Sequence, residues 1–244
     1  MNFIEALESG RLRAASPQGD HWVVNTEVKE GILNLFRTGQ LQDFTGGFVD
    51  KHTLPPRAFH VADGVRMVPG GSSVRCGTYI AKGVVIMPPA YINIGAYVDE
   101  GTMVDSNVLV GSCAQIGKHV HLSAAVQIGG VLEPIGARPV IIEDGAFIGA
   151  GVIIVEGVRV CKNAVIAPGV TLSKNIPIYD CVNECLITDQ TIPEDMIVVP
   201  GSRPATQAYA KSMGLSMHCA LIIKKRDAGS NVALALESAL RELT

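Results

Sequence analysis

Few residues of this chain have the type and position to do chemistry. Asp105 directly follows the apolar Val104, and its carboxylate could accept a proton or a hydrogen bond from a substrate amine, although a solvated surface aspartate is the alternative. His119 and His121 flank Val120, and imidazoles act as bases or as metal ligands. A third ligand would have to come from a distant segment or another chain, since the other histidines are His21, His52, His60 and His218. We therefore expect no metal site, and a surface or interface role for the histidines.

Cysteine spacing and sequence motifs exclude several kinds of site. Cys181 and Cys185 are the only closely spaced cysteines, and a single C-x3-C pair is weak evidence for zinc. The chain contains neither a G-x-x-x-x-G-K-[ST] phosphate loop nor a G-x-S-x-G elbow, which disfavours P-loop nucleotide hydrolysis and α/β-hydrolase chemistry. No permanently bound cofactor is expected, and the residues that contact a cofactor are not predicted.

Composition narrows the class of protein further. The net charge of −3 and the lack of a basic block, beyond Lys224–Arg226, disfavour nucleic acid as a partner. No apolar run approaches the ~20 residues of a membrane span, and the acidic start Met1–Glu8 does not resemble a signal peptide. We therefore expect a cytoplasmic protein without a membrane partner, whose six cysteines are reduced.

The elements that must position these side chains follow from a repeat of six residues. Every sixth position from Val68 to Ile128, and again from Ile142 to Leu172, is Ile, Leu or Val. This period fits neither an amphipathic helix nor an alternating strand, but it is typical of a β-helix with one inward aliphatic residue per face. Three faces give a coil of about 18 residues and roughly six stacked coils. By resemblance to known hexapeptide-repeat proteins, we predict a mainly β fold with a left-handed parallel β-helix.

The repeat is interrupted once and is flanked by other structure. Ile128 and Ile142 are 14 residues apart, so eight extra residues leave the coil as a loop at 129–139 that either shapes a binding site or is a neutral insertion. We divide the chain into an N-terminal α/β region (1–60), the β-helix (61–178), and C-terminal strands and helix (179–244). Helices are predicted from Glu27 to Leu41 and over 231–243, the second capped by Asn231, and strands over 196–199 and 219–223.

Several segments resemble one enzyme family. They are Tyr91–Asp105 (YINIGAYVDEGTMVD), Val110–Gly117 (VGSCAQIG), GGVLEP at 129–134, VIIED at 140–144, FIGA at 147–150, VEG at 155–157 and CALIIKKRD at 219–227. Together they are similar to the tetrahydrodipicolinate N-succinyltransferases of bacterial lysine and diaminopimelate biosynthesis. The similarity covers about residues 60–228 well and is weaker over 1–59, where LESGRLR at 7–13 still fits.

The resemblance implies a reaction and an assembly. Succinyl-CoA, tetrahydrodipicolinate and water would yield N-succinyl-2-amino-6-oxopimelate and CoA. Succinyl-CoA would thus be a co-substrate rather than a resident cofactor. The resemblance also implies a homotrimer with active sites between neighbouring β-helices, each site drawing on two subunits.

Two residues match substrate-binding positions of the family. Arg66 matches an arginine whose guanidinium suits a substrate carboxylate, and Asp105 matches an aspartate that we expect to orient the attacking amine and remove its proton. One position departs from the family: many members carry Glu where this chain has Ile153, so whatever that Glu does is not available here.

Other functions remain open from the sequence alone. The Ile153 departure favours an acetyl-CoA-dependent acyltransferase acting on the same or a related amino diacid. A β-helical scaffold without chemistry would leave Arg66 and Asp105 unexplained. A β-helical carbonic anhydrase would need a third histidine, which the repeat lacks.

Overall fold

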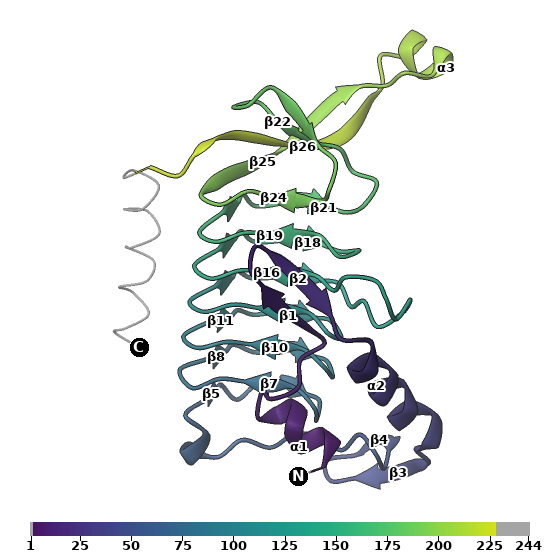
Figure 1. Cartoon of the computed structure of the whole chain (residues 1–244), viewed down its shortest axis with the longest axis vertical. Coiled ribbons are helices and arrows are strands. Elements are labelled where there is room, and N and C mark those ends of the chain that lie inside the picture. The colour runs from purple at the N-terminus through teal and green to yellow at the C-terminus, as the bar shows by residue number, and fades with distance from the viewer. Residues whose placement is uncertain (1, 228–244) are drawn as a thin grey trace.

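The computed structural model describes residues 2–227, and most of them build a left-handed parallel β-helix (Figure 1). Short strands form three sheets that run the length of the coil. Sheet I contains β7 (Tyr79–Ile80), β10 (Tyr97–Val98), β13 (Gln115–Ile116), β16 (Ile141–Ile142), β19 (Arg159–Val160) and β24 (Thr191–Ile192). Sheet II contains β5 (Arg66–Met67), β8 (Val85–Ile86), β11 (Met103–Val104), β14 (His121–Leu122), β17 (Phe147–Ile148), β20 (Val165–Ile166) and the start of β25 (Met196–Pro204). Sheet III contains β6 (Ser73–Val74), β9 (Tyr91–Ile92), β12 (Leu109–Val110), β15 (Gln127–Ile128), β18 (Ile153–Ile154) and β21 (Thr171–Leu172).

The predicted inward column forms the core. Tyr97 pairs with Gln115, and Val98 with Ile116, so successive coils are offset by 18 residues. All predicted inward residues from Val74 to Leu172 are buried. Val68 is the exception, because Met67 pairs with Ile86 and packs against the core in its place. The corner that contains Gly70 and Gly71, both at positive φ, holds one residue more than the other corners and shifts the register.

A corner glycine shows why the coil needs backbone freedom. Gly101 lies between sheets I and II with φ of +67°, a conformation that L side chains rarely adopt. A Cβ at this position would come within 2.4 Å of Nδ1 of His119, which stacks on it from the next coil. Close stacking of corners is therefore possible only with glycine at this site.

The eight extra residues lie between β15 and β16, as the spacing predicts. Gly111 has no room for a Cβ, which would lie 2.1 Å from the backbone nitrogen of Gly130 at the start of the loop. The loop then turns toward the N-terminal region, where Leu132 packs against its small core and the buried Lys29 donates from Nζ to the carbonyl of Ala137 at 2.6 Å. In this chain the loop therefore ties the N-terminal region to the coil.

The N-terminal region covers sheet I (Figure 1). It contains α1 (Phe3–Glu8), β1 (Ala15–Gln18), β2 (His21–Val24), α2 (Thr26–Thr38), β3 (Leu41–Phe44), β4 (Phe48–Lys51) and a 3-10 turn, η1 (Val61–Asp63). The predicted helix therefore ends earlier than Leu41. Gly39 takes extended backbone angles that stop the helix, and Leu41 begins a strand.

The C-terminal strands close the end of the coil. After β21, parallel pairing continues through β24 and the first residues of β25, beyond residue 178. β22 (Ile178–Asp180), β23 (Cys185–Ile187), α3 (Ala208–Ser212) and β26 (Ser216–Lys225) complete this part, and β26 pairs along β25. The two predicted strands lie within β25 and β26, whereas the predicted helix over 231–243 lies outside the described residues. Within residues 2–227, no helix has the length and apolar character needed to cross a bilayer.

Candidate functional site

Arg66 and Asp105 lie along the same sheet of the β-helix. Arg66 is the outward residue of β5 and is exposed. Asp105 directly follows β11, which is separated from β5 by β8 alone. Neighbouring strands are about 4.8 Å apart, so the backbones of β5 and β11 are about 10 Å apart. The long side chain of Arg66 and the carboxylate of Asp105 can therefore both contact one small molecule that lies on this face.

The Asp105 carboxylate is held in place and remains accessible. Its Oδ1 accepts a hydrogen bond from the backbone N–H of Ser106 at 2.7 Å, and the side chain is 29% exposed. Its Oδ2 lies 3.9 Å from Nε2 of His121, whose ring packs edge-on against Phe147 with centroids 4.9 Å apart. An oriented carboxylate next to an imidazole is suited to accept and pass on a proton.

The two histidines of the sequence analysis have different surroundings. His119 is exposed at a corner between sheets I and II. His121 lies on the outer side of sheet II but is buried, because Met103 and Phe147 pair beside it. Among residues 2–227, no three His, Cys, Asp or Glu side chains are grouped closely enough to hold a metal.

The proximity of Asp105 and His121 was not predicted from the sequence. The signal was available in the 18-residue coil: Met103 and His121 are one coil apart, so the residue two positions after Met103 is a diagonal neighbour of His121.

Ile153 lies on a different sheet from Asp105 in the same chain. It is the outward residue of β18 in sheet III, between Gln127 and Thr171, and is 38% exposed. Its side chain offers no acid, base or hydrogen bond. Tyr91, on the same sheet, is also exposed, so sheet III presents two large exposed apolar side chains among polar ones such as Gln127 and Thr171.

The remaining singled-out residues lie away from this face. Cys181 and Cys185 are exposed free thiols at the turn between β22 and β23. The loop at 129–139 contacts the N-terminal region rather than the Asp105 face.

The chain is similar to proteins of one activity. A model of the tetrahydrodipicolinate N-succinyltransferase N-terminal region matches residues 1–38, and a bacterial transferase hexapeptide model (six repeats) matches residues 139–174. The 2,3,4,5-tetrahydropyridine-2,6-dicarboxylate N-succinyltransferase of Cupriavidus metallidurans is 45% identical over 99% of this chain and 88% of its own length. The enzyme of the same name from Albidiferax ferrireducens is 44% identical over the same shares of the two chains.

A solved structure shows a looser similarity. A Campylobacter jejuni chain named as a 2,3,4,5-tetrahydropyridine-2-carboxylate N-succinyltransferase is 14% identical to this chain, with a TM-score of 0.47. The comparison covers 90% of this chain and 61% of the other.

Proposed function

Since this chain belongs to the tetrahydrodipicolinate N-succinyltransferase family and is an N-succinyltransferase, we propose that Asp105 and Arg66 perform its reaction on the outer face of sheet II. The reaction moves a succinyl group onto the nitrogen of tetrahydrodipicolinate, in lysine and diaminopimelate biosynthesis. The site assignment rests on one observation: Arg66 and Asp105 lie on the outer face of the same sheet, on or next to strands that are two positions apart in its order. Because the chain is an N-succinyltransferase, the two alternatives of a β-helical scaffold without chemistry and a β-helical carbonic anhydrase are excluded.

Asp105 is proposed to act as the base. The hydrated acceptor presents its nitrogen to the carboxylate, which orients the N–H and accepts the proton as the nitrogen attacks the thioester carbonyl. A C–N bond forms to the succinyl carbonyl, the C–S bond breaks, and CoA leaves as a thiolate that takes up a proton. The ring of the hydrated acceptor opens at its other C–N bond, so that the carbon that had added water becomes the 6-oxo group of the product. The Ser106 N–H orients the carboxylate, and the His121 imidazole lies 3.9 Å from its other oxygen, as a neighbour that could receive the proton after a small movement.

Arg66 is proposed to bind one of the two acceptor carboxylates. A guanidinium forms two parallel hydrogen bonds with a carboxylate, which fixes orientation as well as affinity. An exposed arginine without an acidic residue within 4.0 Å, among residues 2–227, is available for such a contact.

We further propose succinyl-CoA as the donor, although an acetyl-CoA-dependent transfer is the alternative. The names of the curated relatives support succinyl transfer. The apolar side chain of Ile153 is the observation that favours the alternative, because it cannot contribute the charge or hydrogen bonds of the usual Glu.

A homotrimer with sites between subunits is the proposed assembly. The N-terminal region covers sheet I, whereas sheet III exposes Tyr91 and Ile153, which suits burial against another subunit. Light scattering during gel filtration should give three times the 25.8 kDa chain mass; a monomer would contradict this assembly.

We also propose a cytoplasmic location, supported by six free cysteines.

Replacing Arg66 with Gln is expected to weaken acceptor binding selectively. The KM for tetrahydrodipicolinate should rise about 10- to 100-fold, the equivalent of ~1.4–3 kcal/mol for a charged hydrogen-bonded contact. The KM for succinyl-CoA should change less than about 3-fold, because Arg66 is proposed to contact the acceptor only. Steady-state kinetics with each substrate varied in turn measures both values. The control is Arg37→Gln, which changes an exposed arginine and should leave both KM values unchanged. Arg57→Gln is less suitable, because the guanidinium of Arg57 donates a hydrogen bond to the backbone carbonyl of Thr78. An unchanged acceptor KM in Arg66→Gln would remove this residue from the site.

A further inference from the structure

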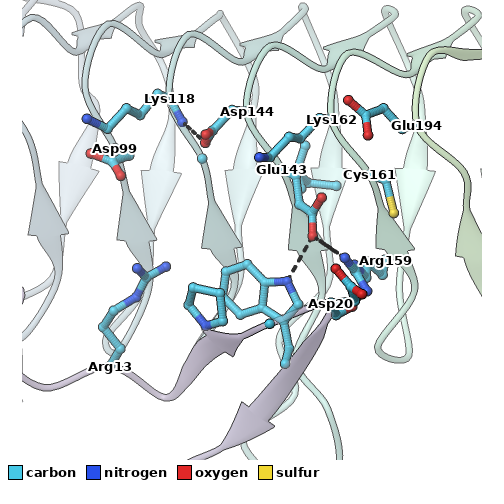
Figure 2. A pocket seen from close by; sticks show the side chains of 15 residues that line it. Arg13, Asp20, Asp99, Lys118, Glu143, Asp144, Arg159, Cys161, Lys162 and Glu194 are labelled. Carbon is cyan, nitrogen blue, oxygen red and sulfur yellow. Dashed lines mark hydrogen bonds and ion pairs between the residues drawn. The ribbon is translucent and has the colours of Figure 1, made fainter.

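A polar cavity lies between the N-terminal hairpin and the coil (Figure 2). The β1–β2 hairpin forms one wall, and the other wall is the edge of sheet I with its corners toward sheet II. The volume is about 410 Å³, within the range of small-molecule sites. Asp105 is on the opposite edge of sheet II, at the corner toward sheet III, so this cavity is separate from the candidate active site.

Part of the cavity wall is occupied by structural contacts. Glu143 accepts a hydrogen bond from Nε1 of Trp22 at 2.9 Å and pairs with Arg159 at 2.7 Å. Arg159 also donates to the carbonyl of Asp20 at 2.8 Å. These groups fasten the hairpin to the coil, so their charges are already compensated within the chain.

Arg13 differs from these groups. Its guanidinium lies 3.6 Å from the ring centroid of Tyr97 and 5.4 Å from that of Trp22, and its Nε donates to Oε1 of Gln115 at 3.0 Å. No carboxylate of residues 2–227 comes within 4.0 Å of it, and burial lowers its pKa. The remaining guanidinium N–H groups are thus held rigidly at the cavity without an anionic partner. A carboxylate is the group that best matches this planar donor set.

Two carboxylates lie on the coil side of the same end of the cavity. Asp99 accepts from the backbone N–H of Glu100, and Asp144 accepts from that of Lys118, each at 2.8 Å and each through Oδ1. Both are near enough to raise the pKa of Arg13, although by less than burial lowers it, but neither forms an ion pair with it. Figure 2 shows Asp99 and Arg13 directed toward the same space.

Lys118 also lines the cavity, but its Nζ pairs with Glu100 at 3.3 Å, and Glu100 and both carboxylates raise its pKa. Oδ2 of Asp99 accepts a hydrogen bond from the hydroxyl of Tyr97 at 3.4 Å. The cavity therefore presents an anion-binding group, Arg13, and two carboxylates that can bind a cation at the same end.

We propose that this cavity binds a free amino acid, with its α-carboxylate on Arg13 and its α-ammonium against Asp99 and Asp144. The cavity wall carries charges of both signs, because it is lined as well by Lys118, Lys162 and Glu194. An ion of one sign would meet like charges on this wall, whereas a zwitterion can place each of its charges against an opposite one. Because the hairpin forms one wall, the bound molecule links the N-terminal region to the coil and stabilises the folded chain by mass action. This binding does not depend on the transferase reaction.

Calorimetry and thermal unfolding of the full-length protein with each of the twenty common amino acids test the proposal. We expect at least one to bind with Kd below ~1 mM and to raise the unfolding temperature. Its analogues without the amine or without the carboxylate should bind at least ~10-fold weaker. No binding at ~10 mM, or equal binding of either analogue, would overturn the assignment.

Variants then locate the site. Arg13→Gln should abolish binding of the amino acid. Asp144→Asn should weaken binding at least ~10-fold, although its amide oxygen can still accept the hydrogen bond from the backbone N–H of Lys118. If Arg13→Gln fails to fold, Asp99→Asn and Asp144→Asn carry the test. Arg11→Gln, an exposed arginine two residues away, is the matched control and should bind normally. Asp105→Asn should also bind normally, which separates this cavity from the active site. Binding that survives Arg13→Gln, or is lost in Asp105→Asn, would contradict the proposal.

Discussion

Asp105→Asn is expected to lower kcat by about 10²- to 10⁴-fold, the usual contribution of a positioned general base. An amide oxygen can still accept the hydrogen bond from the Ser106 N–H, so the local turn should persist. The amide cannot take the proton from the attacking nitrogen, and its contact with His121 loses the negative charge. Steady-state kinetics with tetrahydrodipicolinate and succinyl-CoA measures the loss.

Two controls separate a chemical effect from a structural one. Asp43→Asn changes an exposed aspartate in β3 and should leave kcat within about 2-fold, as expected of surface sites. The Asp105→Asn protein should also keep the oligomeric mass and the succinyl-CoA affinity of the unchanged protein. If its kcat is near that of the unchanged protein, Asp105 is not the base.

Ile116→Ala is expected to destabilise the β-helix by about 2–5 kcal/mol. Ile116 is completely buried, and its strand pairs with Val98 in the coil before and Ile142 in the coil after. The coils are stacked in one dimension, so a cavity at this level weakens contacts with both neighbours. Urea unfolding at a fixed protein concentration gives the change in free energy.

A matched change at an exposed isoleucine provides the comparison. Ile223 in β26 is 46% exposed, and Ile223→Ala should cost less than about 1 kcal/mol because little apolar area leaves contact with the core. A loss for Ile116→Ala as small as that for Ile223→Ala would contradict the account of the inward column as the source of stability.

The period of six residues was sufficient to predict the coil. It placed the buried column from Val74 to Leu172 and located the loop between β15 and β16. It was wrong at Val68, because an extra residue in a glycine-containing corner changes register without changing the apolar character of the sequence. The end of α2 was also misplaced, since Leu41 continues the helical apolar pattern although Gly39 has already ended the helix.

The polar contacts were harder to predict than the coil. Arg66 and Asp105 were predicted as site residues by resemblance, and the structure shows that the strands beside them belong to one sheet. The cavity beside Arg13 could not be predicted, because it depends on how a hairpin outside the repeat packs on sheet I. No periodic signal relates Arg13 to Asp99 or Asp144, which are brought near it only by the tertiary structure.

The most direct test of the central claim compares acyl donors. Purified protein is given tetrahydrodipicolinate with succinyl-CoA or with acetyl-CoA, and release of the CoA thiol is followed together with the mass of the acylated product. We predict that kcat/KM for succinyl-CoA exceeds that for acetyl-CoA by at least ~10-fold, a difference of about 1.4 kcal/mol in transition-state binding. A preference for acetyl-CoA, or no acyl transfer from either donor by the folded protein, would contradict succinyl transfer and would direct attention to Ile153.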